Sequence, residues 1–365
     1  MSENRARHMF PGGNTSLGFF SYYDYILPQE QANRIYVIKG GPGTGKSRFM
    51  KQIAHEMLSR GYRVEFMHCS SDSDSLDAIL IQDLKVAMMD GTAPHVIDPK
   101  HPGVVDEILN FGAFWNEEGI KKHKNEIFED SREISRLFSR AYGYLGAAHG
   151  IYQQSASIYA RALDRGKLNR LILGLEKELF AGTESTGEPG RERSLFASAI
   201  TPEGYVNYLD SLLNLGTVYQ IRGDMGSGEE EILVRLRNRA LTCGYDVEGF
   251  YCALNPRKLE HLIIPGLDAA ITTSNTYHHC NTGATRTIDM MDLMDPGLLK
   301  RHQSELEENR TVFDGVMSVA LGSIRQAKEN HDRLEKYYIP YMDFKAMDAC
   351  CQEILHCLTE KGSEQ

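Results

Sequence analysis

The sequence predicts an α/β protein made of two tandem units, each with a parallel sheet covered by helices and followed by a long helical hairpin. Three observations support this prediction. Apolar runs of strand length alternate with amphipathic runs of helix length, which is typical of parallel sheets. A glycine-rich turn joins one such strand to a helix at residues 40–47. The whole pattern then occurs a second time within the 365 residues.

The elements of the first unit are expected in a fixed order. A strand at "RHMF" leads to a helix at "LGFFSYYDYIL", and then the strand "RIYVI" and the helix "SRFMKQIAHEMLSR" enclose the glycine-rich turn. Next come a strand at "YRVEFMHC", a short helix at "SLDAILI" and a third strand at "KVAMM". Apolar residues spaced by three and four then predict helices over 117–180,.

The second unit repeats the first. From Tyr36 to Asp106 the chain aligns with its second half at a constant shift of 183 residues, and the helical stretches align at a shift of 179. The chain is therefore an internal duplication of about 180 residues. We expect a first unit over 1–180, a linker of small and polar residues over 181–193, and a second unit over 194–365 with its helical part at 297–359,. Within that second unit "EGYVNYLDSLL" and "KLEHLII" are expected to be helical, and "DAAIT" a strand.

The composition excludes several classes of protein. With 41% apolar and 25% charged residues the chain is an ordinary globular sequence, and its net charge of −10 disfavours a general nucleic-acid or membrane-surface binder,. No run of about 18 apolar residues predicts a membrane span, and the N-terminal residues lack the apolar core of a signal peptide. Seven scattered cysteines without CxxC spacing indicate reduced thiols and a cytoplasmic location,.

The glycine-rich turn "KGGPGTGKS" matches G-x-x-x-x-G-K-[ST], the P-loop pattern of proteins that bind nucleoside triphosphates,. Its glycines allow backbone N–H groups to point at phosphates, and the start of the following helix adds partial positive charge. Lys46 is expected to bind the β- and γ-phosphates, and Ser47 to bind Mg²⁺. The residues expected to contact the nucleotide are Gly40, Gly41, Pro42, Gly43, Thr44, Gly45, Lys46, Ser47 and Arg48.

Asp90, which follows the apolar strand "KVAMM", is the candidate acid that holds Mg²⁺ through its water,. In the second copy Lys46 becomes Glu229, and Asp90 becomes Thr273. Because a carboxylate cannot bind an anionic phosphate, we expect one working site in the first unit. The second loop keeps only the glycines of a tight strand-to-helix turn.

Two loops at strand ends are expected to border the working site, because ligands of open α/β sheets bind beyond the carboxyl ends of the strands. In "HCSSDSDSLD", Asp72 and Asp74 could orient a water, accept a proton or help to hold Mg²⁺. Alternatively, Asp74 or Ser75 caps the helix expected after them. In "DGTAPHVIDP", His95 could contact the γ-phosphate or bond only to its own turn, since its copy His278 persists in the second unit.

The second unit also contains a cluster of metal-ligating residue types. The stretch "TYHHCN" places His278, His279 and Cys280 together. Adjacent ligands point in different directions, and no partner pair at metal-site spacing follows. We therefore do not predict a metal site there.

The second unit has gained two cations near its degenerate loop. Arg257 stands at the position of Asp74, and Lys258 at that of Ser75. In one interpretation both are solvated residues at the start of the "KLEHLII" helix. In the other, Arg257 stabilises charge on the phosphates bound at Lys46.

Four stretches of the sequence together resemble an uncharacterised family of bacterial tandem P-loop ATPase-like proteins: "RHMFPGGNTSLGFFSYYD", "KGGPGTGKS", "HCSSDSDSLD" and "DGTAPHVIDP". The likeness covers essentially the whole chain, including "FASAITPEGYVNYLD" in the second copy. A more distant likeness is to RecA- and KaiC-type ATPases. Those enzymes usually have a catalytic Glu after the second strand, where this chain has Ser70, Ser71 and Asp72.

The motifs and the resemblance imply a Mg²⁺-dependent ATP-binding protein, and we predict an ATPase whose second unit is regulatory. The absence of a G-protein-like N-K-x-D motif favours ATP over GTP. One alternative is a phosphotransferase in which "HCSSDSDSLD" holds a small hydroxyl-bearing substrate. Another is a nucleotide-binding switch that hardly turns over. The client, whether a protein or a small molecule, is not predicted.

Overall fold

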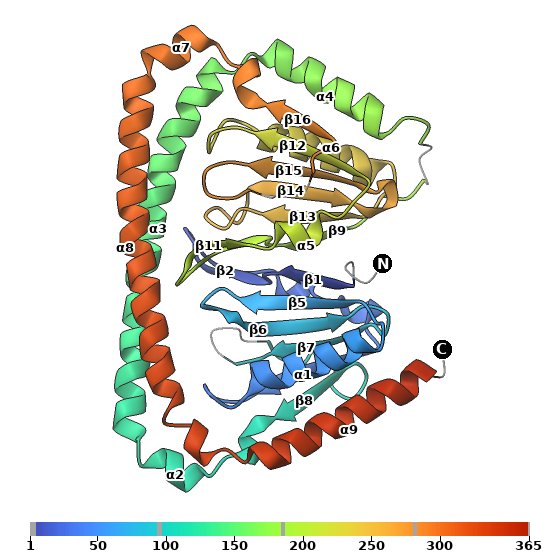
Figure 1. Cartoon of the computed structure of the whole chain (residues 1–365), viewed down its shortest axis with the longest axis vertical. Coiled ribbons are helices and arrows are strands. Elements are labelled where there is room, and N and C mark those ends of the chain that lie inside the picture. The colour runs from blue at the N-terminus through green and yellow to red at the C-terminus, as the bar shows by residue number, and fades with distance from the viewer. Residues whose placement is uncertain (1–4, 93–96, 184–186, 280–282, 364–365) are drawn as a thin grey trace. The chain divides into compact units, whose positions relative to one another are not determined.

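The computed structural model describes residues 5–92, 97–183, 187–279 and 283–363, which form two compact α/β units (Figure 1). The first unit comprises Met1–Gly12, Ser21–Arg140 and Gly322–Gln365, and the second comprises Gly13–Phe20 and Ala141–Leu321. This division differs from the two consecutive halves that the repeat led us to expect. The boundaries fall within two long helices, α3 (Lys124–Ala162) and α8 (Gln303–Glu335).

The first unit is built on a six-stranded mixed sheet in the order β1-β5-β6-β7-β4-β8. Strand β1 is parallel to β5, and β4 is parallel to β7 and β8, whereas β6 is antiparallel to both of its neighbours. The strands are β1 (Ala6–Met9), β4 (Arg34–Lys39), β5 (Val64–Cys69), β6 (Asp72–Ile81), β7 (Val86–Asp90) and β8 (Asp106–Asn110).

Strand β6 contradicts the helix that we expected at "SLDAILI". Strand β5 ends at Cys69 and β6 begins at Asp72, and so short a link can join neighbouring strands only as an antiparallel hairpin,. A short apolar run fits a buried helix and a buried strand equally well, so periodicity did not separate them. The sheet is therefore mixed rather than wholly parallel, and the helix cap considered for Asp74 or Ser75 is wrong.

The second unit has the corresponding sheet, in the order β16-β12-β15-β14-β13-β9. Strand β14 is antiparallel to β13 and β15, and the other neighbours are parallel, so the helix expected at "KLEHLII" is also a strand. The strands are β9 (Glu192–Leu195), β12 (Thr217–Arg222), β13 (Val247–Tyr251), β14 (Leu259–Ile264), β15 (Ala269–Ser274) and β16 (Arg286–Asp289).

The aromatic segment before each loop strand is also less helical than expected. "LGFFSYYDYIL" forms strand β3 (Gly18–Ser21) and a 3₁₀ turn at Tyr23–Tyr25. Its copy forms β11 (Gly204–Asn207) and the four-residue helix α5 (Leu209–Leu212). Short two-stranded sheets join β2 (Gly12–Thr15) to β3 and β10 (Ser198–Thr201) to β11. The preference of aromatic residues for strands explains this difference.

In each unit the helix after the loop packs against a helix from the end of the other sequence repeat. In the first unit α1 (Lys46–Ser59) buries its apolar stripe in one cluster with α9 (Phe344–Ser363). In the second unit α6 (Glu230–Thr242) is clustered in the same way with α4 (Arg165–Leu179). The short helices α2 (Glu117–Lys121) and α7 (Pro296–Arg301) precede the two long ones. Sequence periodicity shows which face of a helix is apolar, but it does not identify the partner of that face.

The exchange of terminal helices predicts where a defect in α9 is felt. Leu358 is 2% exposed in the cluster of the first unit, so Leu358→Ala should destabilise that unit by about 2–5 kcal/mol,. Hydrogen exchange should accelerate in α1 and remain unchanged in α6. The matched control is Leu173→Ala on α4, because Leu173 is 58% exposed and its loss should cost less than about 0.5 kcal/mol,. Faster hydrogen exchange in α6 rather than in α1 would contradict the packing of α9 against the first unit.

Candidate functional site

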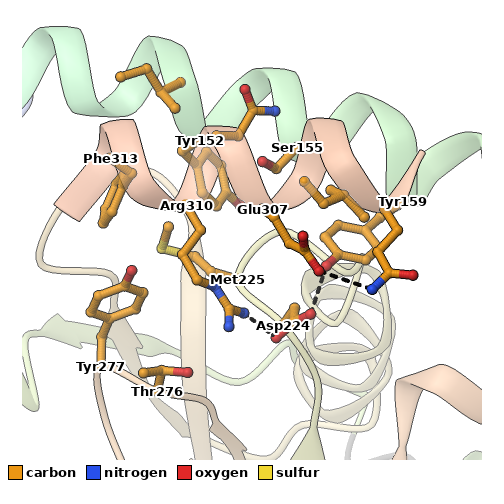
Figure 2. A pocket seen from close by; sticks show the side chains of 14 residues that line it. Tyr152, Ser155, Tyr159, Asp224, Met225, Thr276, Tyr277, Glu307, Arg310 and Phe313 are labelled. Carbon is orange, nitrogen blue, oxygen red and sulfur yellow. Dashed lines mark hydrogen bonds and ion pairs between the residues drawn. The ribbon is translucent and has the colours of Figure 1, made fainter. Parts of the chain in front are cut away.

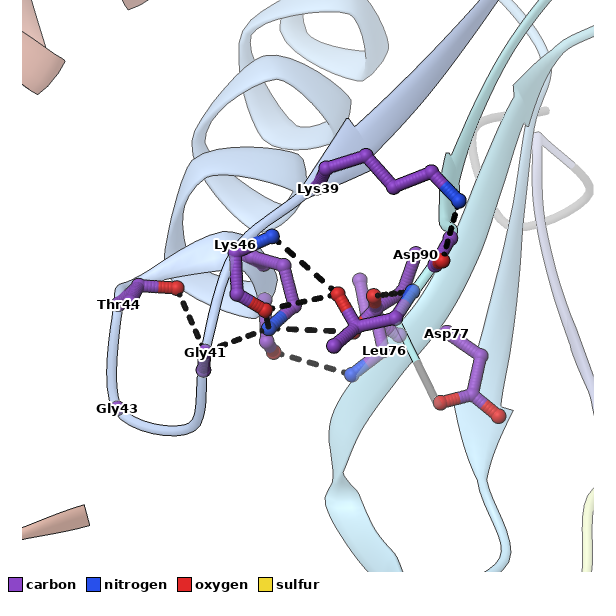
Figure 3. A network of polar contacts seen from close by, with 12 residues as sticks. Lys39, Gly41, Gly43, Thr44, Lys46, Leu76, Asp77 and Asp90 are labelled. Carbon is purple, nitrogen blue, oxygen red and sulfur yellow. Dashed lines mark hydrogen bonds and ion pairs between the residues drawn. The ribbon is translucent and has the colours of Figure 1, made fainter. Parts of the chain in front are cut away.

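The Gly40–Ser47 loop connects β4 to α1 in the first unit (Figure 3). Two of its glycines have φ angles that other residues rarely adopt, 64° at Gly43 and 84° at Gly45,. Helix α1 begins at Lys46, and no side chain caps its N-terminus. The turn thus has the glycine-dependent backbone that an anion-binding strand-to-helix connection requires.

The Lys46 ammonium folds back onto this loop. It donates to the carbonyl oxygens of Gly40 at 3.0 Å and Gly41 at 2.8 Å, and it lies 3.5 Å from the carboxylate of Asp90. The side chains of Lys46 and Asp90 are only 11% and 15% exposed. Strand β7 lies beside β4 in the sheet, with Asp90 paired to Ile38, and this pairing brings the two charged residues together.

Thr92 fastens the end of β7 to the loop. Its backbone N–H donates to the Asp90 carboxylate at 2.8 Å, and its hydroxyl donates to the Gly40 carbonyl at 2.8 Å. Sequence analysis did not single out this residue. The spacing D-x-T after an apolar strand is the available signal, because an Asp side chain often accepts the N–H two residues further on.

The first residues of β6, from Asp72 onward, lie beside Ser47 at the start of α1. The Ser47 hydroxyl oxygen accepts the N–H of Leu76 at 3.0 Å, and the Asp72 carboxylate accepts the hydroxyl of Ser75 at 2.9 Å. The antiparallel hairpin of β5 and β6 therefore delivers Asp72 to the same end of the sheet as the loop.

The other residues named from the sequence are less engaged. Asp74 is exposed. Arg48 is also exposed and lies 3.6 Å from the carboxylate of Asp348 on α9. His95 lies outside the described residues, so its role stays a prediction.

The end of α8 brings further charged residues to the first loop. The Glu335 carboxylate accepts the backbone N–H of Gly43 at 3.2 Å and lies 3.8 Å from the His331 ring. The Lys328 ammonium lies 3.4 Å from the Asp72 carboxylate. One helix thus places an anion on the loop backbone and a cation beside the acid that borders it.

Sequence analysis missed these residues because α8 belongs to the second copy. A usable signal was the repeat itself, aligned at the shift of 179 residues. Three residues of α8 that lie near the first loop are charged or ionisable. Of the three α3 residues that align with them, two cannot carry a charge at neutral pH. The pairs are Lys328 and His149, His331 and Tyr152, and Glu335 and Ala156.

The segment after α8 packs closely on the glycines of the loop. A Cβ at Gly41 would lie 2.8 Å from Cε1 of Tyr338, and one at Gly45 would lie 3.0 Å from Cε of Met347. Larger residues at these positions would therefore collide with side chains from the C-terminal part of the first unit. The glycines permit this cover as well as the turn.

In the second unit the degenerate loop carries its own neutralising ion pair. Glu229 replaces Lys46, and its carboxylate lies 2.5 Å from the ammonium of Lys258, with both side chains at most 5% exposed. Although burial alone would raise the pKa of Glu229, the Lys258 ammonium holds that pKa below its usual value,. The interpretation of Lys258 as a solvated residue is therefore wrong.

Helix α3 covers the second loop with uncharged side chains. Gly226 and Gly228 keep positive φ angles of 91° and 92°. A Cβ at Gly226 would lie 3.0 Å from Cβ of Ala156 and 3.3 Å from the ring of Tyr152. The turn keeps its positive φ angles, and the position that Lys46 occupies in the first unit is filled by a closed ion pair.

A cavity of about 250 Å³ borders the tip of the second loop, between residues of α3 and α8 (Figure 2). Asp224, the copy of Gly41, points into this region. Its carboxylate accepts the Tyr159 hydroxyl at 2.7 Å and pairs with Arg310 at 2.8 Å. These contacts tie the tip of the loop to both long helices within the second unit.

Arg257 lies in the turn before β14, where it is exposed and its backbone N–H donates to the Asn255 side chain at 3.2 Å. The expected helix at this point is absent. Arg257 and Lys46 belong to different compact units. The proposed action of Arg257 on the phosphates stays a prediction.

Comparisons of the chain with protein-family models, curated proteins and solved structures gave no match. None of the helices in the described ranges combines the length and the apolar composition that a bilayer span requires.

The buried ion pair of the second loop predicts that losing one partner destabilises the unit more than replacing both. Glu229→Ala leaves the Lys258 charge buried without its partner, so it should lower the free energy of unfolding by about 3–5 kcal/mol, and Lys258→Ala should do the same. Replacing both residues by methionine should cost much less, because no uncompensated charge remains. Urea denaturation followed by circular dichroism measures all three variants.

The control for this measurement is Glu231→Ala, which breaks the exposed pair with Arg165 and should cost less than about 1 kcal/mol,. Because the pKa of Glu229 is lowered in the folded state, its contribution is complete above the unfolded carboxyl pKa. The contribution is then lost as the pH falls through the folded pKa,. A cost for Glu229→Ala no larger than the control would show that the pair does not stabilise the unit.

Proposed function

We propose that the chain binds ATP with Mg²⁺ at the Gly40–Ser47 loop and hydrolyses it, while the second unit has lost its own site. The observation that carries this proposal is the nearly buried Lys46 ammonium, held inside a glycine turn beside the strand-terminal acid Asp90. The second unit has Glu229 and Thr273 at the same two positions, and Glu229 is neutralised by Lys258. One nucleotide per chain is therefore expected.

The contacts around the first loop are compatible with a bound phosphate. The Gly43 N–H already donates to an anionic partner, a carboxylate oxygen of Glu335. The Lys46 ammonium would exchange neutral carbonyl partners for a phosphate oxygen, which forms a stronger charge-assisted bond,. The Ser47 hydroxyl and the Asp90 carboxylate offer the oxygen ligands that Mg²⁺ prefers, and the ion would neutralise phosphate charge when bound.

Among the acids at the loop, Asp72 is a better candidate than Asp74 for orienting the attacking water. Its carboxylate is fixed by Ser75 and Lys328, whereas Asp74 is exposed. The ammonium of Lys328 supplies a second positive charge at the same edge of the site. In this proposal Lys46 stabilises charge on the phosphates, and the pair of Asp72 and Lys328 positions the water.

Two other functions stay open, and a turnover assay with purified protein separates them. Phosphate release with Mg²⁺ and ATP alone supports an ATPase. ADP formation that requires a hydroxyl-bearing acceptor supports a phosphotransferase. Tight binding with neither reaction supports a switch. Membership in the tandem P-loop family and a cytoplasmic location belong to the same proposal.

Lys46→Ala should abolish ATP binding or reduce turnover by about 100-fold or more, because its ammonium is the cation that the motif assigns to the β- and γ-phosphates. Ser47→Ala and Asp90→Asn should cause smaller losses that excess Mg²⁺ partly restores. Isothermal titration with ATP and a phosphate-release assay give the two readouts.

The matched control is Lys122→Ala, since Lys122 is exposed on the same unit and is not part of the motif. Circular dichroism would establish that the Lys46 variant is folded. Normal turnover by a folded Lys46→Ala protein would mean that the active site lies elsewhere.

Glu335→Ala should tighten ATP binding by roughly three- to tenfold, because the carboxylate of Glu335 competes with phosphate for the Gly43 N–H,. Glu335→Gln removes the charge but keeps a hydrogen-bond acceptor, so its ATP affinity should lie between that of the wild type and that of Glu335→Ala. Glu329→Gln, at an exposed position on the same helix, serves as the control. Weaker or unchanged ATP binding in Glu335→Ala would refute the competition while leaving the Lys46 site untouched.

A further inference from the structure

The second unit contains a buried group of metal-ligating side chains that has no part in the loop. Glu260, His261 and His278 are 4%, 0% and 6% exposed, and their ligating atoms all lie within 4.8 Å of one another. One carboxylate oxygen of Glu260 lies 3.7 Å from Nε2 of His261, and the other lies 3.7 Å from Nδ1 of His278. Two imidazoles thus face one carboxylate in a nearly closed space.

An irregularity in β14 brings Glu260 and His261 together. Adjacent residues of a regular strand point to opposite faces of the sheet. Here the register with β13 pairs Phe250 with His261 and Tyr251 with Leu259, so Glu260 is an extra residue. Such a bulge redirects a side chain, and bulges are frequent beside functional sites. It allows two neighbouring residues to contribute to one site.

Two threonines of β15 hold the outer edges of the imidazole rings. Nδ1 of His261 is 2.8 Å from the Thr272 hydroxyl, and Nε2 of His278 is 2.9 Å from the Thr273 hydroxyl. The Thr273 N–H also approaches Nδ1 of His261, at the longer distance of 3.4 Å. In the tautomers in which each ring donates its outer N–H to its threonine, Nε2 of His261 and Nδ1 of His278 present lone pairs to Glu260. Metal-bound histidines usually have such an outer hydrogen bond. The Thr273 N–H, which donates to Nδ1 of His261, favours the other tautomer of that ring, and its Nε2 proton would have to leave when a metal binds,.

The inner nitrogen of His261 is the unexplained atom. Nε2 is buried and makes no hydrogen bond to any of the residues that the structure describes. A buried polar atom without a partner is uncommon in folded proteins, and a bound ion is one of its standard explanations.

We propose that Glu260, His261 and His278 bind a divalent transition-metal ion, with zinc as the best match. Two imidazole nitrogens and one carboxylate oxygen suit zinc, whereas Mg²⁺ prefers an all-oxygen site. Ligand bonds of about 2.0–2.2 Å in a tetrahedron place the ligand atoms about 3.3–3.5 Å apart. The two separations of 3.7 Å between Glu260 and the imidazoles therefore need only a slight contraction, and the two imidazole nitrogens, which lie within 4.8 Å of each other, would have to approach to a similar distance. A water would supply the fourth ligand.

The charges nearby permit a cation. Lys258 is the adjacent ammonium, and Glu229 neutralises it at 2.5 Å.

The site is specific to the second unit. In the first copy the bulged acid persists as Asp77, where it accepts the Tyr23 hydroxyl at 2.9 Å. The copy of His261 there is Ala78. Of the three residues in "TYHHCN", His278 takes part, His279 is exposed, and Cys280 lies outside the described residues.

The test uses the full chain without an affinity tag, stripped with a chelator and titrated with Zn²⁺ and with Co²⁺. We expect one zinc per chain, a higher melting temperature with zinc, and a Co²⁺ absorption spectrum typical of four ligands. His261→Ala and His278→Ala should weaken binding by at least about 100-fold. His279→Ala, the exposed neighbour, and His331→Ala, in a second His/Asp/Glu group with Asp332 and Glu335, should bind as the wild type does.

The wild-type titration needs no variant to fold, so failure to bind Zn²⁺ or Co²⁺ would overturn the proposal. Loss of binding in His331→Ala together with retention in folded His278→Ala would also overturn it, and would assign the ion to the end of α8. Neither result depends on ATP, so the metal proposal and the ATPase proposal succeed or fail separately.

Discussion

Each unit must neutralise one nearly buried charge at the point where its loop enters a helix. In the first unit the charge is the Lys46 ammonium, and Asp90 at the end of β7 faces it at 3.5 Å. In the second unit the charge is the Glu229 carboxylate, and Lys258 faces it at 2.5 Å. An unpaired charge in either place would be costly, so the loop residue and its partner had to change together. The neutralising residue comes from a different strand end in each unit, which explains why the second loop could invert its sign and keep its glycines.

The residue that neutralises the loop charge determines whether the contacts of that charge could be exchanged for an anion. Asp90 leaves Lys46 bonded to two neutral carbonyl oxygens, and such contacts can be exchanged for a phosphate,. Lys258 instead fills the space at the second loop, where the hydrogen bond from Ser227 also fixes the Glu229 carboxylate. A closed ion pair of this kind has no remaining affinity for an anion. The second unit therefore keeps the glycine turn between strand and helix without an exchangeable cation.

The sequence predicted much of this arrangement and missed the part that depends on tertiary partners. The loop, its flanking strand and helix and the repeat were all readable, because glycine spacing and alternating apolar runs are local signals. The strands β6 and β14 were not, since a short apolar run becomes a strand or a helix according to its neighbours. The roles of Glu335 and Lys328 at the first loop were also missed, because they lie about 290 residues further along the chain,. The metal-ligating group needed the bulge at Glu260, which no periodicity reveals.

The covers of the two loops differ in the same sense as their charges. The first loop is covered by a helix end whose Glu335 carboxylate binds the Gly43 N–H, a contact that an incoming anion can replace. Gly226 of the second loop is covered by Ala156 and Tyr152, and the tip of that loop is held by the bonds of Asp224 to Tyr159 and Arg310. A contact that an anion can replace permits opening in response to a ligand, whereas a loop held over a closed ion pair favours one fixed state. The polar cover lies at the end of α8, which begins in the second unit and ends in the first, so Glu335 and the loop that it contacts belong to the same compact unit.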